Sequence, residues 1–502
     1  MLPTLPIEPA PYCYTEASDF DVVIANSIGV SKQGHLIVHS PSRWSEAVFQ
    51  PHRHFVYYPF YLGTLSTLLK KETALRIKMV DGCLEKLDTE QYFQKILALQ
   101  PAFLFIESAS LLYEENLAMA LALKKQIGTQ ILFGGPHVSL YPEKALQDGI
   151  DFVFRGEYEN SVLSFFQKKK QQGSQKIFDQ EEPVAFRQMP WPEDEDVSRM
   201  QYGIPGEPSS DYKEIQMYAT RGCRGGCTFC VVRHVYYQAP RHIARDPLDV
   251  VNEMFALKEK YPELEGFFFD EEDHFDNSDF LIQFCNELIR RNNTLKIEGL
   301  GRIGGARLDL LPLLKKAGYY KIRIGVETLH PDIQKSIRKR IPIAQFENFL
   351  IACKQNLLDA YTTFQVGLPG STREKDLFTL SHLKKYLKQE LIKNLQVSIF
   401  TPFPGTPGFA EAKPYLNSQN FLDFNGGEQS VVNWPEYHSK DIQRTYQDFL
   451  TLRDHIQLFT RLRSKQGIPW LLDKFRKHSL RSLISKTSRR LSTELKYVFQ
   501  IG

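Results

Sequence analysis

Three cysteines within eight residues carry the strongest chemical signal in the sequence. Cys223, Cys227 and Cys230 lie in the stretch RGCRGGCTFC, with three residues between the first two and two residues between the last two. Three thiolates on one loop can each ligate one iron of a cubane iron–sulfur cluster, which leaves the fourth iron open to an exogenous chelator. The glycines among the cysteines would let the backbone wrap closely around such a cluster. The spacing therefore predicts an iron–sulfur cluster with one open iron.

Two other interpretations of these cysteines remain open. The first is a zinc site to which His234 supplies a fourth ligand. Zinc sites usually combine two short hairpins that each carry a cysteine pair, and no second pair lies nearby in the sequence. The second is a chance grouping of three structural cysteines. We favour the cluster over both. A disulfide framework is not expected either, because the chain has seven cysteines and they are unevenly spread.

The chain around the cysteines alternates between short apolar runs and helical stretches, first over residues 1–170 and again over residues 214–410. Such alternation is typical of α/β folds with a parallel sheet, whose ligands lie at the carboxyl ends of the strands. The expected strands of the first block are 21–25, 75–80, 102–106, 130–133 and 151–154. Those of the second block are 214–219, 266–269, 295–299, 321–325, 362–367 and 395–400. The six units of the second block fit a partial (β/α)6 barrel.

The remaining segments complete the expected domain organisation. Residues 171–213 are rich in Gln, Pro, Gly and acidic residues, and we expect them to form a linker. Residues 411–502 are expected to be mainly helical and become strongly basic. Within them, residues 471–490 predict a basic amphipathic helix, which we expect to pack over the mouth of the barrel. The alternative is contact with a membrane surface.

The pattern CxxxCxΦC, with aromatic Phe229 before the last cysteine, resembles the signature of the radical S-adenosylmethionine (SAM) superfamily. The resemblance extends across residues 214–410, because recognisable elements follow the expected strands in order. These elements are the acidic run 269–273, Arg302, the run IGVET at 324–328, the run GLPG at 367–370 and the run FPGTP at 403–407. The ordered set is far more specific than the cysteine spacing alone.

This resemblance implies a [4Fe–4S] cluster on the three cysteines and SAM bound at its open iron. In the superfamily, an acidic or glycine-rich segment after the second strand accepts hydrogen bonds from the methionine amino group. The residues that the resemblance implies as SAM contacts are Phe229, Glu271, Glu272, Asp273, Arg302 and Glu327. The acidic residues among them also have an ordinary interpretation, since acidic residues at strand ends often cap helices.

The first block resembles the Rossmann-like cobalamin-binding domain that precedes the barrel in many radical SAM enzymes. The resemblance covers most of residues 20–165 and rests on the run YYPFYLG at 57–63, on Asp81, and on the runs FGGPH at 133–137 and DFVFRGE at 151–157. Small residues at strand ends would let backbone amides approach the flat corrin ring. The implied cobalamin contacts are Tyr58, Gly63, Gly134, Gly135, Pro136, His137, Gly156 and Glu157.

One motif of cobalamin enzymes is missing from the sequence. The DxHxxG motif, which supplies a histidine ligand to cobalt, does not occur. Related radical enzymes commonly lack it as well, so its absence does not exclude cobalamin. We therefore expect His137 to be a loop residue rather than a cobalt ligand. The alternative for the whole first block is a vestigial Rossmann-like domain that binds nothing.

The combined resemblance implies a radical enzyme. Electron transfer from the reduced cluster into SAM would release a 5′-deoxyadenosyl radical, which removes a hydrogen atom from an unactivated carbon. Cobalamin on the first block would deliver a methyl group to that carbon, as in hopanoid and natural-product methylases of similar layout. We expect a cobalamin-dependent C-methyltransferase. A cyclase, oxidase or rearrangement enzyme is the alternative, because the anaerobic Mg-protoporphyrin ester oxidative cyclase has a similar layout. A non-catalytic iron–sulfur protein is a third, less favoured, interpretation.

Composition limits the partners and the location that we expect. The chain has 502 residues, 24% of them charged, and its net charge of +3 gives no reason to expect nucleic acid. No apolar run has the length of a membrane span and no signal pattern opens the chain, so we expect a cytoplasmic protein. Membrane contact through the basic tail would place it at the inner membrane face and suit a lipid-like substrate; otherwise we expect a small molecule. Cluster reduction would need an external electron donor of flavodoxin or ferredoxin type.

Overall fold

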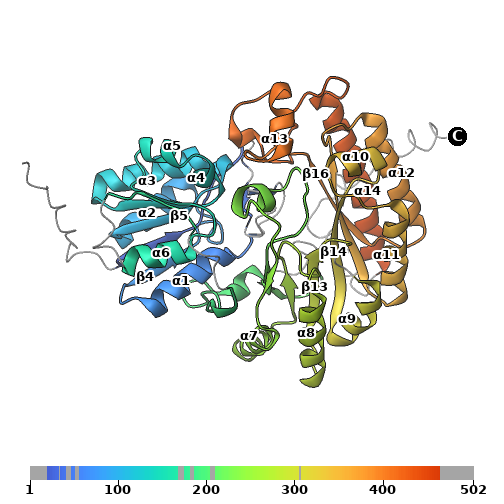
Figure 1. The fold of residues 1–502 in the computed structure, drawn as a ribbon, viewed down its shortest axis with the longest axis horizontal. Helices are drawn as coiled ribbons and strands as arrows, with labels where there is room; N and C mark the ends of the chain where they lie inside the picture. Colours follow the sequence, from blue (N-terminus) through green and yellow to red (C-terminus); the bar gives the residue numbers. More distant parts are fainter. Residues whose placement is uncertain are drawn as a thin grey trace, which may run out of the picture.

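The computed structural model describes residues 20–32, 34, 36–40, 47–50, 56–167, 174–180, 186–203, 210–304 and 307–463. The basic segment 471–490 lies outside the described residues, and so do the predictions made for it. Figure 1 shows two α/β units side by side. We call them the N-terminal unit, up to residue 180, and the barrel unit, from residue 210. Each is built on a six-stranded parallel sheet; the sequence predicts six strands for the barrel unit and five for the N-terminal unit.

The sheet of the N-terminal unit has the strand order β4-β1-β5-β6-β7-β8. Its strands are β1 (Val22–Ala25), β4 (Ile77–Val80), β5 (Phe103–Glu107), β6 (Gln130–Gly134), β7 (Phe152–Phe154) and β8 (Ile177–Phe178). The first five coincide with the expected runs, because helices cover both faces of such a sheet and its strands are therefore apolar throughout. The helices of this unit are α1 (Phe60–Glu72), α2 (Thr89–Leu99), α3 (Tyr113–Ile127), α4 (Pro136–Leu140), α5 (Pro142–Gln147) and α6 (Glu159–Gln167).

This unit differs from the sequence prediction in two places. Strand β8 lies in the stretch predicted as a linker, yet it pairs with β7 as a sixth strand. A hairpin of β2 (Leu36–His39) and β3 (Ala47–Gln50) forms a separate two-stranded sheet. Strands of two to four residues are too short to show a periodicity in the sequence.

The sheet of the barrel unit has the order β16-β15-β14-β13-β12-β9, and β9 and β16 are its two edges, so the described sheet is a half-barrel. Its strands are β9 (Glu214–Met217), β12 (Gly266–Phe269), β13 (Lys296–Gly301), β14 (Tyr319–Glu327), β15 (Asp359–Val366) and β16 (Asn394–Ile399). All six expected strands are present. The helices between them are α7 (Pro247–Lys260), α8 (Ser278–Arg290), α9 (Leu311–Ala317), α10 (Pro331–Ser336), α11 (Ile343–Gln355) and α12 (Arg373–Lys388).

Figure 1 shows α11 and α12 on the side of the half-barrel that faces away from the N-terminal unit, and α7, α8 and α9 below its strands. After the last strand, α13 (Pro407–Ala412) leads to α14 (Ser439–Arg463), which packs against β16 and α12. The short helical turns are η1 (Ser110–Leu112), η3 (Phe186–Gln188), η4 (Arg199–Tyr202), η5 (Val232–Tyr236), η6 (Leu308–Leu310), η7 (Lys413–Tyr415) and η8 (Phe421–Asp423). No helix in the described part of the chain is long and apolar enough to cross a membrane.

A buried ion pair joins β13 and β14 within the half-barrel. Arg323 on β14 donates to both carboxylate oxygens of Glu298 on β13, at 3.0 and 2.7 Å. The guanidinium carbon also lies 4.2 Å from the ring centroid of Phe268 and 4.5 Å from that of Tyr361. Neighbouring residues of β14, such as Ile322, belong instead to the hydrophobic core. The strand therefore presents charge on its inner face and apolar side chains on its outer face.

Asp376, on α12, ties the end of β15 to the C-terminal segment. Its carboxyl accepts hydrogen bonds from the Gly367 amide at 2.9 Å, the Ser371 hydroxyl at 2.6 Å and the Tyr437 hydroxyl at 3.0 Å. Burial nevertheless raises the pKa of this carboxyl from 3.8 to about 6, because the charged form is poorly solvated inside the protein.

We expect Asp376 to make the fold less stable as the pH rises from about 4 to about 7. The folded state keeps this proton up to about pH 6, whereas the unfolded chain releases it near pH 3.8. The folded state therefore binds more protons in this window, and its stability falls with rising pH by about 3 kcal/mol. Melting curves of wild type and Asp376→Asn across this window test the assignment. The variant should lose this part of the pH dependence, and an unchanged slope would contradict it.

Candidate active site

The cysteine stretch forms a loop that follows β9. The loop is framed by a short hairpin of β10 (Thr220–Arg221) and β11 (Ile243–Ala244). Cys223, Cys227 and Cys230 are half-buried, and Cys230 interacts electrostatically with both of the others. Between them, the Thr228 amide donates to the Ile337 carbonyl at 3.2 Å, which fastens the middle of the loop to the barrel unit. The three thiols therefore share one loop, whose middle is attached to the barrel unit through Thr228.

Two other residues of the loop have clear local roles. Phe229 packs against the hydrophobic core of the barrel unit. His234, the candidate fourth ligand of a zinc site, has its Nε2 3.2 Å from the carbonyl oxygen of Cys227. Burial lowers the pKa of His234, so its ring is neutral at physiological pH. The geometry thus gives His234 a backbone contact within the loop.

Two cations lie beside the thiols. Arg302 interacts electrostatically with Cys223, and the buried Lys339 does so with Cys223 and Cys227. Burial raises the pKa of all three thiols, to about 12 for Cys223, so the unliganded thiols hold their protons at neutral pH. Binding to iron removes those protons. Three thiols that become thiolates beside two cations are a donor set that fits an iron–sulfur cluster.

Gly222 begins the loop in a conformation that only glycine adopts easily. Its φ is +87°, and a Cβ at this position would lie 2.4 Å from the carbonyl oxygen of Arg241. Backbone on both sides leaves little freedom to relieve such a contact. We expect Gly222→Ala to displace the loop and to lower cluster uptake by at least about tenfold.

Gly226, in the same loop, supplies a matched control. A Cβ there would meet nothing within 4 Å, and the residue has no positive φ. The iron and sulfide content of each variant after anaerobic reconstitution measures the effect. Gly226→Ala should match wild type, and equal iron contents in the two variants would show that the backbone of Gly222 is not critical.

Glu271, the first of the three predicted acidic SAM contacts, is fully engaged by protein donors. Its carboxylate accepts hydrogen bonds from the Ala219 amide at 2.5 Å and the Thr220 hydroxyl at 2.9 Å, and it lies 2.6 Å from Nδ1 of His274. The side chain is completely buried. These contacts join the end of β12 to the chain that leads into the cysteine loop.

Glu272 and Asp273 also hold neighbouring segments in place. Glu272 accepts from the Gly222 amide at 3.2 Å and from the Tyr61 hydroxyl of α1 at 3.3 Å. Asp273 accepts from the backbone amide and from Nε of Arg302, at 3.0 and 2.6 Å. The structure therefore brings the acidic run and Arg302 to the cysteine loop, as the sequence predicts. Direct contact of these residues with SAM stays a prediction.

Glu327 ends β14 with a left-handed backbone, at a φ of 70°. Its carboxylate lies 3.2 Å from Nζ of Lys339 and accepts from Nε2 of Gln365 at 3.1 Å. Gly325 makes room for this pair, since a Cβ there would lie 2.7 Å from Oε1 of Glu327 and 2.9 Å from Nζ of Lys339. A strained non-glycine residue of this kind is often found at functional sites.

Lys339 is a member of this site that sequence analysis does not find. It lies in the run IRKRI, between α10 and α11, and its side chain is only 9% exposed. Its neighbours Arg338 and Arg340 are exposed. A run of basic residues is usually solvated, and nothing in the sequence marks the middle one as buried.

Tyr58 and Gly63, two of the predicted cobalamin contacts, pack at the junction of the two units. The Tyr58 amide donates to Oε1 of Gln216 in the barrel unit at 2.8 Å, and its hydroxyl donates to the Glu193 carbonyl at 2.5 Å. A Cβ on Gly63 would lie 1.9 Å from that hydroxyl oxygen. The close approach of Tyr58 therefore explains why residue 63 is a glycine.

Two further predicted contacts are glycines at the end of β6, and internal packing accounts for both. A Cβ on Gly134 would lie 2.8 Å from the ring of Phe105 and 2.9 Å from that of Tyr158. Gly135 has a φ of +99°, and a Cβ there would lie 2.7 Å from the carbonyl oxygen of Ser108. The strand ends of β5 and β6 are thus in close backbone contact.

Pro136 begins α4, so His137 lies in a short helix rather than in a loop. Nδ1 of His137 is 3.1 Å from the Ser110 hydroxyl, and its ring stacks on Tyr113 with 3.9 Å between centroids. Burial lowers its pKa to about 4, so the ring is neutral. Gly156, after β7, has a φ of +67° and donates its amide to the Ser139 hydroxyl at 3.0 Å.

Glu157, the last predicted cobalamin contact, joins the two units. Its carboxylate accepts from Arg221 at 3.2 Å and from the Tyr237 hydroxyl at 3.2 Å, and it lies 3.0 Å from the guanidinium of Arg241. All three donors flank the cysteine loop. The carboxyl end of β7 in the N-terminal unit therefore meets the cysteine loop of the barrel unit.

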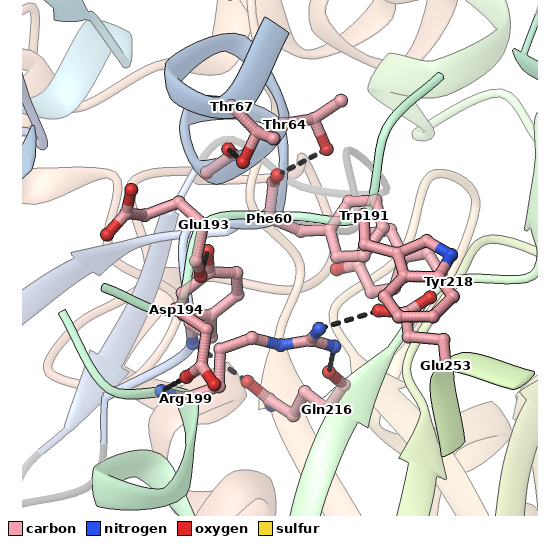
Figure 2. Close-up of polar contacts among 12 residues, drawn as sticks. Phe60, Thr64, Thr67, Trp191, Glu193, Asp194, Arg199, Gln216, Tyr218 and Glu253 are labelled. Atoms are coloured by element: carbon pink, nitrogen blue, oxygen red, sulfur yellow. Dashed lines mark hydrogen bonds and ion pairs between the residues drawn. The ribbon is translucent and has the colours of Figure 1, made fainter. Parts of the chain in front are cut away.

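A cavity of about 500 Å³ lies between α1, residues 191–199 and α7. None of the predicted site residues lines it. Two of its three lysines are paired with carboxylates, Lys70 with Glu193 and Lys260 with Asp194. Figure 2 shows this region, where Arg199 joins the connecting segment to the barrel unit. Nothing in the cavity points to a ligand.

Comparison with known proteins identifies the barrel unit. Residues 217–380 match the family model of the Radical SAM superfamily. This part of the chain is a radical SAM domain. The match includes the cysteine loop and strands β12 to β15, and its cofactors are accordingly a [4Fe–4S] cluster and SAM. The resemblance stated from the sequence is thereby confirmed.

The chain also has relatives over most of its length. It is 23% identical over 402 residues to an uncharacterized methyltransferase of Pyrococcus horikoshii. The aligned region covers 76% of this chain and 82% of the relative. Its fold is similar to that of TsrM, a radical SAM methyltransferase from Kitasatospora setae whose structure contains tryptophan and a SAM analogue. The TM-score is 0.58 at 16% identity, and the match covers 78% of this chain and 76% of TsrM.

A second solved structure of similar fold is OxsB, a cobalamin-dependent SAM radical enzyme with aqua-cobalamin and SAM bound. The TM-score is 0.61 at 14% identity, over 96% of this chain and 81% of that one. The two structural likenesses confirm the expected fold, in which an α/β unit precedes a half-barrel.

Proposed function

We propose that this radical SAM enzyme is a cobalamin-dependent C-methyltransferase that acts on an unactivated carbon of a small-molecule substrate. The observation that carries the proposal is the contact of Glu157, at the carboxyl end of β7, with residues that flank the cysteine loop. Ligands of parallel sheets bind at the carboxyl ends of strands, so ligands of the two units would be neighbours. The methyltransferase name of the Pyrococcus relative and the cobalamin bound by OxsB support this function.

In this proposal Cys223, Cys227 and Cys230 hold the cluster. The cluster and SAM, when bound, supply the radical chemistry that removes a hydrogen atom from carbon. Lys339 and Arg302 offset the negative charge of the three thiolates. An external donor of flavodoxin or ferredoxin type would supply the electron.

The carboxyl end of the N-terminal sheet fits a polar ligand as well. The Ser108 hydroxyl, directly after β5, is buried and has no hydrogen-bond partner among the described residues. A buried hydroxyl without a hydrogen bond lowers the stability of the fold, unless a ligand or a water molecule supplies the missing hydrogen bond. Gly135 lies against the Ser108 backbone without a side chain. We propose that Ser108, Gly135 and His137 contact the amide arms of cobalamin, and that Tyr58, Gly63, Gly134, Gly156 and Glu157 support this surface.

Retention of cobalamin tests the proposal. Protein incubated anaerobically with methylcobalamin should keep the visible corrin absorbance after desalting. Gly135→Ala should lose it, because a methyl group would enter the space between β5 and β6. Gly128→Ala is the matched control, since Gly128 also has a positive φ, of +71°, but a Cβ there would meet nothing within 4 Å. If wild type retains no corrin, the proposal of a cobalamin-dependent methyltransferase is contradicted, and cyclisation, oxidation or rearrangement without cobalamin is favoured instead.

A further inference from the structure

Arg221, which immediately precedes the cysteine loop, is enclosed by residues that come before the barrel unit in the chain. Its guanidinium pairs with Glu159 at 2.6 Å and with Glu157 at 3.2 Å. The guanidinium carbon lies 4.5 Å from the ring centroids of both Tyr61 and Phe186. Both carboxylates are 0% exposed and the arginine side chain is 1% exposed. The cysteine loop therefore begins at a charge that the N-terminal unit buries.

The other end of the loop is held by the same carboxylate. Arg241 lies 3.0 Å from Glu157, and the amide of Arg241 is 3.5 Å from the carbonyl oxygen of Cys223. Tyr237 also donates to Glu157, at 3.2 Å. Glu157 thus contacts both the segment that enters the loop and the segment that leaves it.

A third contact reaches the loop from α1. The Tyr61 hydroxyl donates to Glu272 at 3.3 Å, and the same carboxylate accepts the amide of Gly222 at 3.2 Å. Tyr61 therefore acts on the loop twice, once through its ring on Arg221 and once through its hydroxyl on Glu272.

We propose that Arg221, held by Glu157 and Glu159, is a positioning residue of the cluster site, so that the N-terminal unit is a part of that site. The inference rests on the proposed function, since it takes the cluster to bind Cys223, Cys227 and Cys230. Two arginines face two buried carboxylates here, and removal of one carboxylate leaves a buried cation uncompensated. That cation moves toward another partner or toward water and carries the adjoining Gly222 and Cys223 with it. The cysteines then hold the cluster less tightly.

The test uses full-length, anaerobically reconstituted protein and the variants Glu159→Gln and Tyr61→Phe. The first removes a charge with little change of shape, and the second removes one hydroxyl and keeps the ring over Arg221. The control is Glu298→Gln, which breaks a similarly buried pair with Arg323 on the neighbouring strand, at 2.7 Å. Two readouts are used: the rate at which an iron chelator removes the cluster, and the EPR spectrum of the reduced cluster.

We expect Glu159→Gln to lose its cluster at least about tenfold faster than wild type, with an altered EPR spectrum, and Tyr61→Phe to show a smaller change in the same direction. Glu298→Gln should match wild type in both readouts even if it melts at a lower temperature. If Glu159→Gln and Tyr61→Phe behave as wild type, or if Glu298→Gln loses its cluster as fast as Glu159→Gln, the inference is overturned and the proposed function stands. A wild-type protein that takes up no cluster overturns the proposed function, and the inference with it.

Discussion

Cys227→Ala is expected to abolish both the assembly of the [4Fe–4S] cluster and the cleavage of SAM. Cys227 is the middle cysteine of the loop. The loop is attached to Ile337 next to this cysteine, so the two remaining cysteines cannot shift to take its place as a cluster ligand. The loss of one thiolate leaves the cluster with a second open iron, which exposes it to dissociation. Iron content, visible absorbance and 5′-deoxyadenosine formation should all fall to background.

Cys353→Ala is the control for this variant. Cys353 is buried on α11, and burial raises the pKa of its thiol to about 12, so it behaves as a small apolar side chain. Its replacement should leave iron content and cleavage unchanged. If Cys227→Ala keeps a full cluster, the assignment of the ligands is wrong, and loss of the cluster in Cys353→Ala would point to a general loss of stability.

Lys339→Met is expected to make the cluster harder to reduce. The substitution keeps an unbranched chain of similar length, so the fold should hold, but it removes a cation that lies beside the thiols. Loss of a nearby positive charge disfavours the added electron by about 1–2 kcal/mol, which corresponds to a potential lower by roughly 40–90 mV. An EPR-monitored redox titration measures this shift, and SAM cleavage should slow in parallel.

A double variant separates charge from shape at this position. Glu327 is the partner of Lys339 at 3.2 Å, so Lys339→Met combined with Glu327→Gln restores the net charge of the pair. We expect its potential to return toward that of wild type, and Lys339→Arg should preserve it throughout. A single Lys339→Met variant with full iron and the wild-type potential would contradict the electrostatic role of Lys339.

Many of the strands were accessible from the sequence because they are short apolar runs between helical stretches, whereas β14 and β16 alternate between polar and apolar residues. Strands such as β5 and β12 are buried along their whole length, and burial on both faces leaves no polar alternation to confuse the pattern. The missed elements β8, β10 and β11 have two residues each. Their pairing depends on neighbours that are distant in the chain, which local sequence does not reveal.

The site was predictable to the extent that its residues follow strands. The acidic run, Arg302 and Glu327 lie where the carboxyl ends of parallel strands must converge, next to the cysteine loop. The partners of these side chains were not predictable. Tyr61 reaches Glu272 from 211 residues earlier in the chain, and Glu157 meets Arg221 across the junction of the two units. Both pairs form only when the two folded units dock against each other, and no residue spacing in the sequence predicts how they dock.

The central claim, that the cysteine loop directs radical cleavage of SAM, is tested most directly by the products of one anaerobic reaction. Wild-type protein is reconstituted with iron and sulfide, reduced with dithionite and incubated with SAM. Mass spectrometry should detect 5′-deoxyadenosine in wild type and none in Cys227→Ala. Wild-type protein that carries a full [4Fe–4S] cluster and forms no 5′-deoxyadenosine would contradict the claim.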